Sequence, residues 1–192
     1  MARPKEFDRD KALDAAMQVF WTRGYEATSV GDLINATGIG RQSMYDTFGD
    51  KHALYLAALD RYVQKYGDQV EKAVLGDQPV RKQLREMLAR IIEFTVDDPS
   101  RSCMLLSAAA ERCPLDRGVQ RRFAANTEVM EKALTARFER ARREGEIAAH
   151  HVPQALAKFF VNAVNGLQIS AKSGSDRRTL EQVADLTLSV LG

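Results

Sequence analysis

Apolar residues recur every three to four positions along most of the chain, which is the spacing that places them on one face of an α-helix. No stretch alternates apolar and polar residues over the length of a strand, and the helix formers Ala, Leu, Arg and Glu are abundant. The pattern predicts an all-α protein of about nine helices. These helices are expected over residues 9–22, 29–37, 41–48, 51–75, 80–96, 101–112, 118–143, 153–170 and 176–191.

Residues 38–48 resemble a tight turn followed by a short helix. At about 100° per residue, Met44 and Phe48 fall on one face of this helix, and Gln42 and Asp46 fall on the opposite face. One face is therefore expected to pack against the protein while the other is displayed. This arrangement is typical of a helix-turn-helix, a module that lays its second helix in the major groove of DNA.

The preceding helix carries signals at both ends. Ser29 and Asp32 have the form of a capping box, and Gly38 can adopt the left-handed conformation that ends a helix. Thr28 and Ser29 would bring hydroxyls and backbone amides to a helix N-terminus, where a phosphate is favoured. The alternative interpretation is that Ser29 serves only as a cap.

A long connecting helix is expected over residues 51–75, with Asp50 as its N-cap. Its apolar residues spread over more than one face, as expected of a helix that packs against two bodies. Lys51 lies in the first turn, where the helix dipole disfavours a cation. An anion near Lys51 in a bound state would offset that cost.

The composition restricts the class of protein. No apolar run approaches the roughly 18 residues of a membrane span, and no signal peptide is recognisable at the start, so a cytoplasmic protein without a membrane partner is expected. Cys103 and Cys113 are too few for a disulfide framework and would lie about 15 Å apart on one helix. A redox-sensing thiol is possible in principle, but buried inert thiols are favoured.

The distribution of charge is more informative than the net charge of +2. Residues 1–52 contain seven Lys or Arg and eight Asp or Glu, which gives this segment a net charge of −1. If the segment binds DNA, it must therefore use a few placed cations, hydroxyls and helix-start amides rather than a general positive surface.

The sequence shows no combination of residues that indicates an enzyme. There is no phosphate loop, dinucleotide fingerprint or nucleophile elbow, so neither catalytic residues nor a cofactor are predicted. The histidines His52, His150 and His151 lack partners at metal-ligand spacing, so no metal site is predicted.

Several runs agree together with one known family over about residues 10–55. They are Phe20–Val30, Asp32–Gly38, Gly40–Tyr45 and Phe48–Lys51 followed by Leu54. In these positions the chain resembles the N-terminal domain of TetR-family transcriptional regulators. The resemblance implies a homodimeric regulator, usually a repressor, in which a small-molecule effector controls binding to double-stranded operator DNA. It implies a DNA-binding domain over residues 1–50 and a helical ligand-binding and dimerisation domain over residues 51–192.

The resemblance also implies how DNA is contacted. Thr28, Tyr45 and Lys51 would touch the DNA backbone. Arg41, Gln42 and Ser43, at the start of the helix expected over residues 41–48, would approach base edges. The full predicted set is Thr28, Ser29, Arg41, Gln42, Ser43, Tyr45, Asp46, Thr47 and Lys51. Two positions depart from the family pattern. Gly40 replaces a capping Ser or Thr, and Asp46 is an acid on the displayed face that could accept from a cytosine amino group or act as a local ion-pair or selectivity residue.

Two further sets belong to the rest of the chain. An effector pocket is expected to be lined by Met87, Ile91, Phe94, Met104, Phe123, Thr127 and Met130, although each could be ordinary core. The last two helices are more apolar than a terminal pair needs, which predicts pairing with a second copy and hence a near-palindromic operator. The expected interface residues are Phe160, Val164, Leu167, Val183, Leu186 and Val190, with completion of a monomer core as the alternative.

The main functional alternative is a dimeric DNA-binding protein without a small-molecule sensor. A third possibility is an enzyme or adaptor that retains the fold and binds no specific DNA sequence.

Overall fold

The structure is a computed structural model that describes residues 7–74, 76–98, 102–113 and 115–192, with the backbone alone described for residues 68–73. Within these ranges the chain is all-α, as the sequence predicts, and forms nine helices. Their ends shift from the predicted ranges by a few residues, and the predicted ends at residues 75 and 101 lie outside the described residues. The helices are α1 (Arg9–Arg23), α2 (Val30–Thr37), α3 (Arg41–Phe48), α4 (Lys51–Val74), α5 (Val80–Asp97), α6 (Met104–Arg112), α7 (Arg117–Arg143), α8 (Pro153–Lys172) and α9 (Arg177–Ser189).

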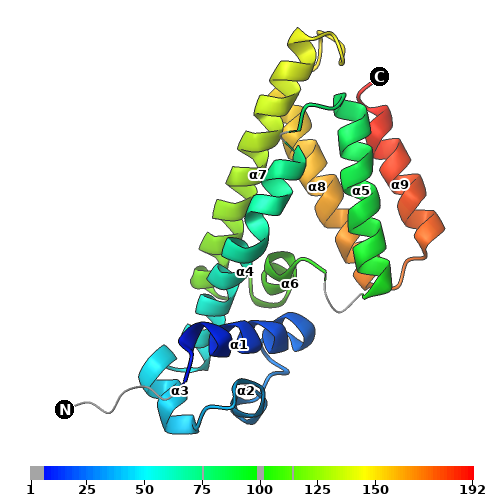
Figure 1. Ribbon diagram of the computed structural model, residues 1–192. Helices are drawn as coiled ribbons and strands as arrows, with labels where there is room; N and C mark the ends of the chain where they lie inside the picture. Colours follow the sequence, from blue (N-terminus) through cyan, green and yellow to red (C-terminus); the bar gives the residue numbers. More distant parts are fainter. Residues whose placement is uncertain (1–6, 75, 99–101, 114) are drawn as a thin grey trace.

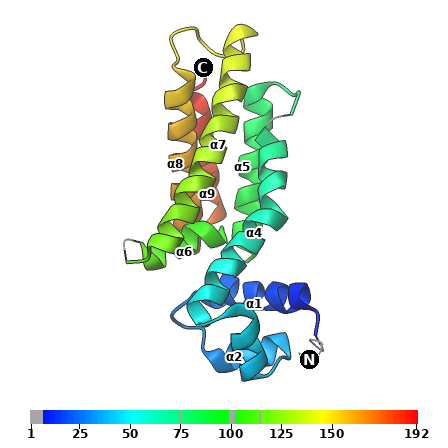
Figure 2. The same cartoon turned by 90° about the vertical axis from the view of Figure 1, so that its left-hand side faces the viewer.

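The helices are arranged as a small N-terminal body and a larger helical bundle. Figure 1 shows α1, α2 and α3 at one end of the molecule, with α5, α7, α8 and α9 forming the bundle at the other. The long helix α4 rises from the N-terminal body and continues along the bundle, as the view in Figure 2 also shows. This arrangement matches the prediction that α4 packs against two bodies.

Two separate clusters of buried side chains hold the molecule together. The C-terminal core cluster is formed mainly by α5, α7, α8 and α9, and includes Leu84, Phe138 and Phe160. The N-terminal core cluster contains Phe20, Leu33 and other residues of α1–α4. It also contains buried residues from α6 and the start of α7, namely Met104, Leu105, Ala108 and Val119. The predicted division at residue 50 therefore remains a prediction, since this core draws on helices well beyond it.

Polar contacts at the start and in the first half of α6 connect this helix to both bodies. Next to its start, the indole Nε1 of Trp21 donates to the buried carbonyl of Ser102 at 2.6 Å. The backbone N–H of Cys103 donates to Oε1 of Gln168 on α8 at 3.0 Å. The ammonium of Lys172 donates to Oγ of Ser107 at 2.8 Å. The Trp21 bond is buried and the Cys103 bond is partly buried, so losing either partner is costly, and α6 is held between α1 and α8.

No helix in the described ranges has the length and apolar character needed to cross a membrane.

Candidate nucleic-acid interface

The entrance to α2 is fixed by the predicted capping box. Oγ of Ser29 accepts from the backbone N–H of Asp32 at 3.1 Å. In return, the Asp32 carboxylate accepts from the Ser29 backbone N–H at 2.9 Å and from its hydroxyl at 2.6 Å. The Ser29 hydroxyl bond is the main cause that lowers the pKa of Asp32 to about 2, with further support from Arg23. The carboxylate is thus ionised at neutral pH and keeps the first turn of α2 in place.

Helix α3 is anchored on one face and exposed on the other, as its sequence pattern predicts. Met44 and Phe48 are 1% and 8% exposed and pack in the N-terminal core cluster. Before the helix, Gly38 has φ of 69°, in the left-handed region where a side chain would be strained. The exposed residues of α3 are Arg41, Gln42, Ser43, Tyr45 and Asp46.

Gly40 is the N-cap residue of α3, and no side chain caps the helix there. A Cβ at this position would meet no atom within 4 Å, so the surface next to the first turn is open. The departure from the family pattern noted in the sequence therefore leaves the first amides of α3 without a side-chain cap.

Asp46 is paired within its own helix. Its Oδ1 accepts a hydrogen bond of 2.8 Å from Nε2 of Gln42, one turn earlier. This partner is a neutral amide, which differs from the local ion pair that the sequence suggested, and a role of Asp46 in selectivity stays a prediction.

Thr28 is placed differently from the prediction that it touches the DNA backbone. Its side chain is buried, with the residue 1% exposed, and its hydroxyl donates to the carbonyl of Gly24 at 2.6 Å. The backbone N–H of Thr28 also donates to the carbonyl of Tyr25 at 3.3 Å, so the turn between α1 and α2 places Thr28 against its own backbone. Thr47 also lies off the displayed face: it is half-buried, and within the described ranges its enclosed hydroxyl oxygen has no hydrogen-bond partner.

Lys51 lies against an aromatic ring at the start of α4. Its ammonium is 4.2 Å from the centre of the Tyr25 ring, and the Arg112 guanidinium of α6 is 4.6 Å from the same centre. A cation over an aromatic face is stabilised by the ring quadrupole. This contact offsets the unfavourable position of Lys51 in the helix dipole within the protein itself.

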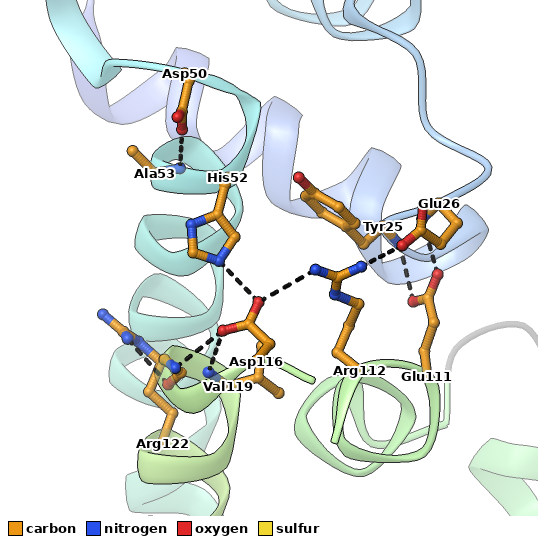
Figure 3. Close-up of polar contacts among 11 residues, drawn as sticks. Tyr25, Glu26, Asp50, His52, Ala53, Glu111, Arg112, Asp116, Val119 and Arg122 are labelled. Atoms are coloured by element: carbon orange, nitrogen blue, oxygen red, sulfur yellow. Dashed lines mark hydrogen bonds and ion pairs between the residues drawn. The ribbon is translucent and has the colours of Figure 1, made fainter. Parts of the chain in front are cut away.

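The loop between α1 and α2 is bound by the end of α6, as Figure 3 shows. One carboxylate oxygen of Glu111 accepts from the backbone N–H of Tyr25 at 2.9 Å, and the other accepts from that of Glu26 at 2.8 Å. Gly24 is required here, because it has φ of 78° and a Cβ would lie 2.8 Å from the same carboxylate. The guanidinium of Arg112 hydrogen-bonds the Glu26 carboxylate next to it.

A second link joins the start of α4 to the start of α7. Nε2 of His52 lies 2.7 Å from Oδ2 of Asp116, and because an ionised carboxylate only accepts, the imidazole N–H donates. The other oxygen of Asp116 caps α7 by accepting from the N–H groups of Gly118 and Val119 at 2.9 and 3.2 Å. Burial raises the pKa of Asp116, but the His52 and backbone hydrogen bonds outweigh it, so the net shift is downward.

Sequence reasoning missed this junction because its partners are far apart in the chain. His52 and Asp116 are separated by 64 positions, and Glu111 and Tyr25 by 86. The one local signal was the cap position of Asp116 just before a predicted helix.

The structure divides the seven residues predicted to line an effector pocket. Met87, Ile91 and Met130 belong to or pack against the C-terminal core cluster. Met104 and Phe123 are associated with the N-terminal core cluster, Phe94 is 49% exposed, and Thr127 is half-buried on α7. Grooves of about 210 Å³ between α5 and α9 and about 430 Å³ between α7 and α8 are lined by none of the seven.

Burial raises the pKa of the Cys103 thiol, the opposite of what a reactive thiol needs.

The six residues predicted to form a dimer interface also divide into two groups. Phe160 and Leu167 lie in the chain's own core, so they have no surface to offer a second copy. This is a correction with a simple cause: α8 is apolar over a wide arc, and both side chains belong to the C-terminal core cluster, where the ring of Phe160 packs against that of Phe138 on α7. Val183, Leu186 and Val190 are exposed and Val164 is partly buried. Phe159, one of the surplus apolar residues of the last two predicted helices, and Ile169 are exposed as well.

Comparison with known proteins shows two matching family models. The model of bacterial regulatory proteins of the tetR family matches residues 12–58, and that of the tetracyclin repressor-like C-terminal domain matches residues 80–186. The chain is 34% identical to the HTH-type transcriptional repressor ComR of Escherichia coli K12, over 97% of this chain and 90% of ComR. It is 32% identical to the uncharacterised HTH-type regulator YezE of Bacillus subtilis, over the whole of both chains.

A solved structure is similar over the full length. It is a cysteine mutant of the TetR family transcriptional regulator CifR in complex with 26-bp double-strand operator DNA, with a TM-score of 0.85, 30% identity and complete coverage of both chains.

We expect Glu111→Gln to loosen the loop between α1 and α2. A glutamine side chain has one acceptor oxygen in place of two, so one of the two backbone N–H groups loses its bond. The loss should cost about 1 kcal/mol, which makes exchange of that amide roughly fivefold faster. Hydrogen–deuterium exchange at Tyr25 and Glu26 measures the change. Glu93→Gln, on the exposed face of α5, is the matched control, and equal exchange in both variants would contradict the role assigned to Glu111.

Asp116→Asn should lower stability by about 1 kcal/mol at neutral pH, because asparagine retains the cap but loses the charge next to His52 and Arg112. The folded-state pKa of Asp116 lies below its ordinary value, so its charge stabilises the fold above about pH 4 and stops doing so at lower pH. Urea denaturation across this range should show the difference between wild type and variant shrinking with acid. A difference that stays constant down to about pH 3 argues against this linkage.

Proposed function

From the premise that this chain belongs to the TetR family of bacterial regulatory proteins, we propose that it is a homodimeric repressor that leaves its operator when a small molecule binds. Membership of the family identifies the chain as a transcriptional regulator and not an enzyme. The proposal places it in the cytoplasm, where its DNA is.

The observation that carries the DNA-binding proposal is the two-faced packing of α3. Met44 and Phe48 hold one face in the core, so the polar residues on the other face keep a fixed position relative to the protein. The complex of CifR with operator DNA is consistent with such a role, since the two chains align over their full length. In the proposed docking α3 enters the major groove.

The proposed contacts follow from which groups are exposed. Arg41, Gln42 and Ser43 would reach base edges, and Tyr45 and Lys51 would contact phosphates together with the uncapped amides at the start of α3. Ser29 is exposed at the start of α2 and stays among the proposed contacts, while Thr28 is buried in the loop before it. Lys51 would leave the Tyr25 ring, or share it, when a phosphate is near.

The dimer proposal rests on apolar side chains that this chain leaves exposed. Leu186 is 70% exposed on α9, with Val183 and Val190 one turn away on either side of it. Phe159 and Ile169 are exposed on α8. Two copies of these helices would bury the surplus in a four-helix contact, and the two α3 helices would then face successive major grooves of a near-palindromic site.

The route from effector to DNA is proposed to pass through α6. One end of α6 is bonded to Gln168 and Lys172 of α8, and the other holds the α1–α2 loop through Glu111 and Arg112. An effector placed between the two core clusters, beside Met104, would displace α6 and with it the start of α4. Operator release requires that the two states differ in DNA affinity by a few kcal/mol.

A second candidate function, dimeric DNA binding without a sensor, is favoured by one observation: the predicted pocket residues are divided between two packed clusters. Screening compounds for release of a selected operator separates the two functions. Release by a compound that does not bind DNA supports the sensor.

Lys51→Ala should weaken binding to every DNA sequence and reduce the slope of log affinity against log salt by about 1 for each subunit, as expected when one phosphate contact is lost. Fluorescence anisotropy over a salt series measures both effects. Lys132→Ala, on α7 far from α3, removes the same charge as a control. The proposed docking is wrong if the two variants behave alike.

Leu186→Asp should convert the dimer to a monomer, because each copy would place an unpaired carboxylate in a desolvated contact. Sedimentation at micromolar protein measures the change. Leu115→Asp is the control, since Leu115 is 84% exposed on the turn between α6 and α7. A Leu186→Asp protein that remains dimeric and folded contradicts the interface.

A further inference from the structure

The displayed face of α3 carries a hydrogen-bonded pair of side chains. Nε2 of Gln42, in the first turn, donates to Oδ1 of Asp46 at 2.8 Å, and both residues are exposed. Their helix is anchored by Met44 and Phe48 and begins after Gly40, where no side chain stands in the way. The pair is therefore held toward any surface that α3 contacts.

The chemistry of the pair determines which way the amide of Gln42 faces. An ionised carboxylate can only accept hydrogen bonds, so the NH₂ of Gln42, and not its carbonyl oxygen, must face Asp46. One N–H of the amide is used by this bond. The second N–H and the acceptor Oε1 remain available, and rotating the amide by half a turn would set two acceptors against each other.

In the major groove, one base offers the complementary pattern of neighbouring groups. Adenine presents a donor at N6 beside an acceptor at N7. Guanine presents two acceptors, thymine a single acceptor with a methyl group, and cytosine a single donor. An amide that presents Oε1 and one N–H side by side matches adenine in two hydrogen bonds.

We infer that Gln42 reads an adenine in each operator half-site and that Asp46 is a positioning residue, which holds the Gln42 amide in the orientation for this base. The inference rests on the proposed docking of α3 in the major groove. It also accounts for an acid on a surface that approaches phosphates: the carboxylate acts through Gln42 instead of contacting the DNA.

The test begins with selection of bound duplexes from a random pool by four proteins: wild type, Gln42→Ala, Asp46→Asn and the double variant. Anisotropy then gives the affinity of each protein for the best duplex and for its three single-base replacements at each position. Asp10→Asn, in the first turn of α1, removes the same charge without touching α3 and is the matched control.

For wild type and the control we expect one position in each half-site to prefer adenine by about tenfold or more, the discrimination typical of a two-bond contact. Gln42→Ala should remove this preference. Asp46→Asn should reduce it to about threefold, because an asparagine amide can also donate to Oε1 and so permits the rotated glutamine. In the double variant Asp46→Asn should have no additional effect on base preference.

Each other outcome overturns the inference in a distinguishable way. If the wild-type protein selects no sequence, both the inference and the proposed function are wrong. A selected operator whose base preferences are unchanged by Gln42→Ala leaves the function standing and removes the adenine contact. Unchanged preference in Asp46→Asn removes the positioning role. A cytosine preference that depends on Asp46 but not on Gln42 shows that the acid reads the base directly.

Discussion

The position of α2 and α3 relative to the rest of the molecule depends on a carboxylate that binds two neighbouring backbone amides. Glu111, at the end of α6, accepts from the N–H groups of Tyr25 and Glu26 and so fixes the loop that leads into α2. Both amides belong to a turn that cannot satisfy them by helix bonding, so the contact has no equivalent within the loop. Since α3 follows α2 after a three-residue turn, its place relative to the bundle is set through this loop and through the packing of α4.

The two core clusters explain why the N-terminal body and the bundle are not independent folding units. Buried residues of α6 and α7 complete the N-terminal core cluster, so the small body is unable to bury its apolar surface with residues 1–50 alone. Helix α6 is therefore part of the N-terminal body by its packing and part of the bundle by its hydrogen bonds to Gln168 and Lys172. A displacement of this helix must alter both bodies.

Local features of the fold could be predicted from the sequence, and contacts between distant segments could not. The face of α3 that carries Met44 and Phe48, the capping box of Ser29 and the cap at Asp50 follow from periodicity and short-range hydrogen bonding. The inward turn of Thr28 and the bond between His52 and Asp116 depend on how the chain packs. Periodicity also fails to separate Phe160 from Leu186, because it reports how apolar a helix is and not which neighbour covers it.

The ring of Tyr25 has a consequence for the energetics of the whole molecule. It lies under two cations, Lys51 from α4 and Arg112 from α6, and each contributes to the field that the other experiences. The free energies with which the two cations bind the ring are coupled, and such coupling is reciprocal. If moving Arg112 changes the binding free energy of Lys51 on the ring, moving Lys51 changes that of Arg112 by the same amount. A phosphate that draws Lys51 away from the ring therefore changes the stability of Arg112 on α6, and a displacement of α6 changes the stability of Lys51 in turn.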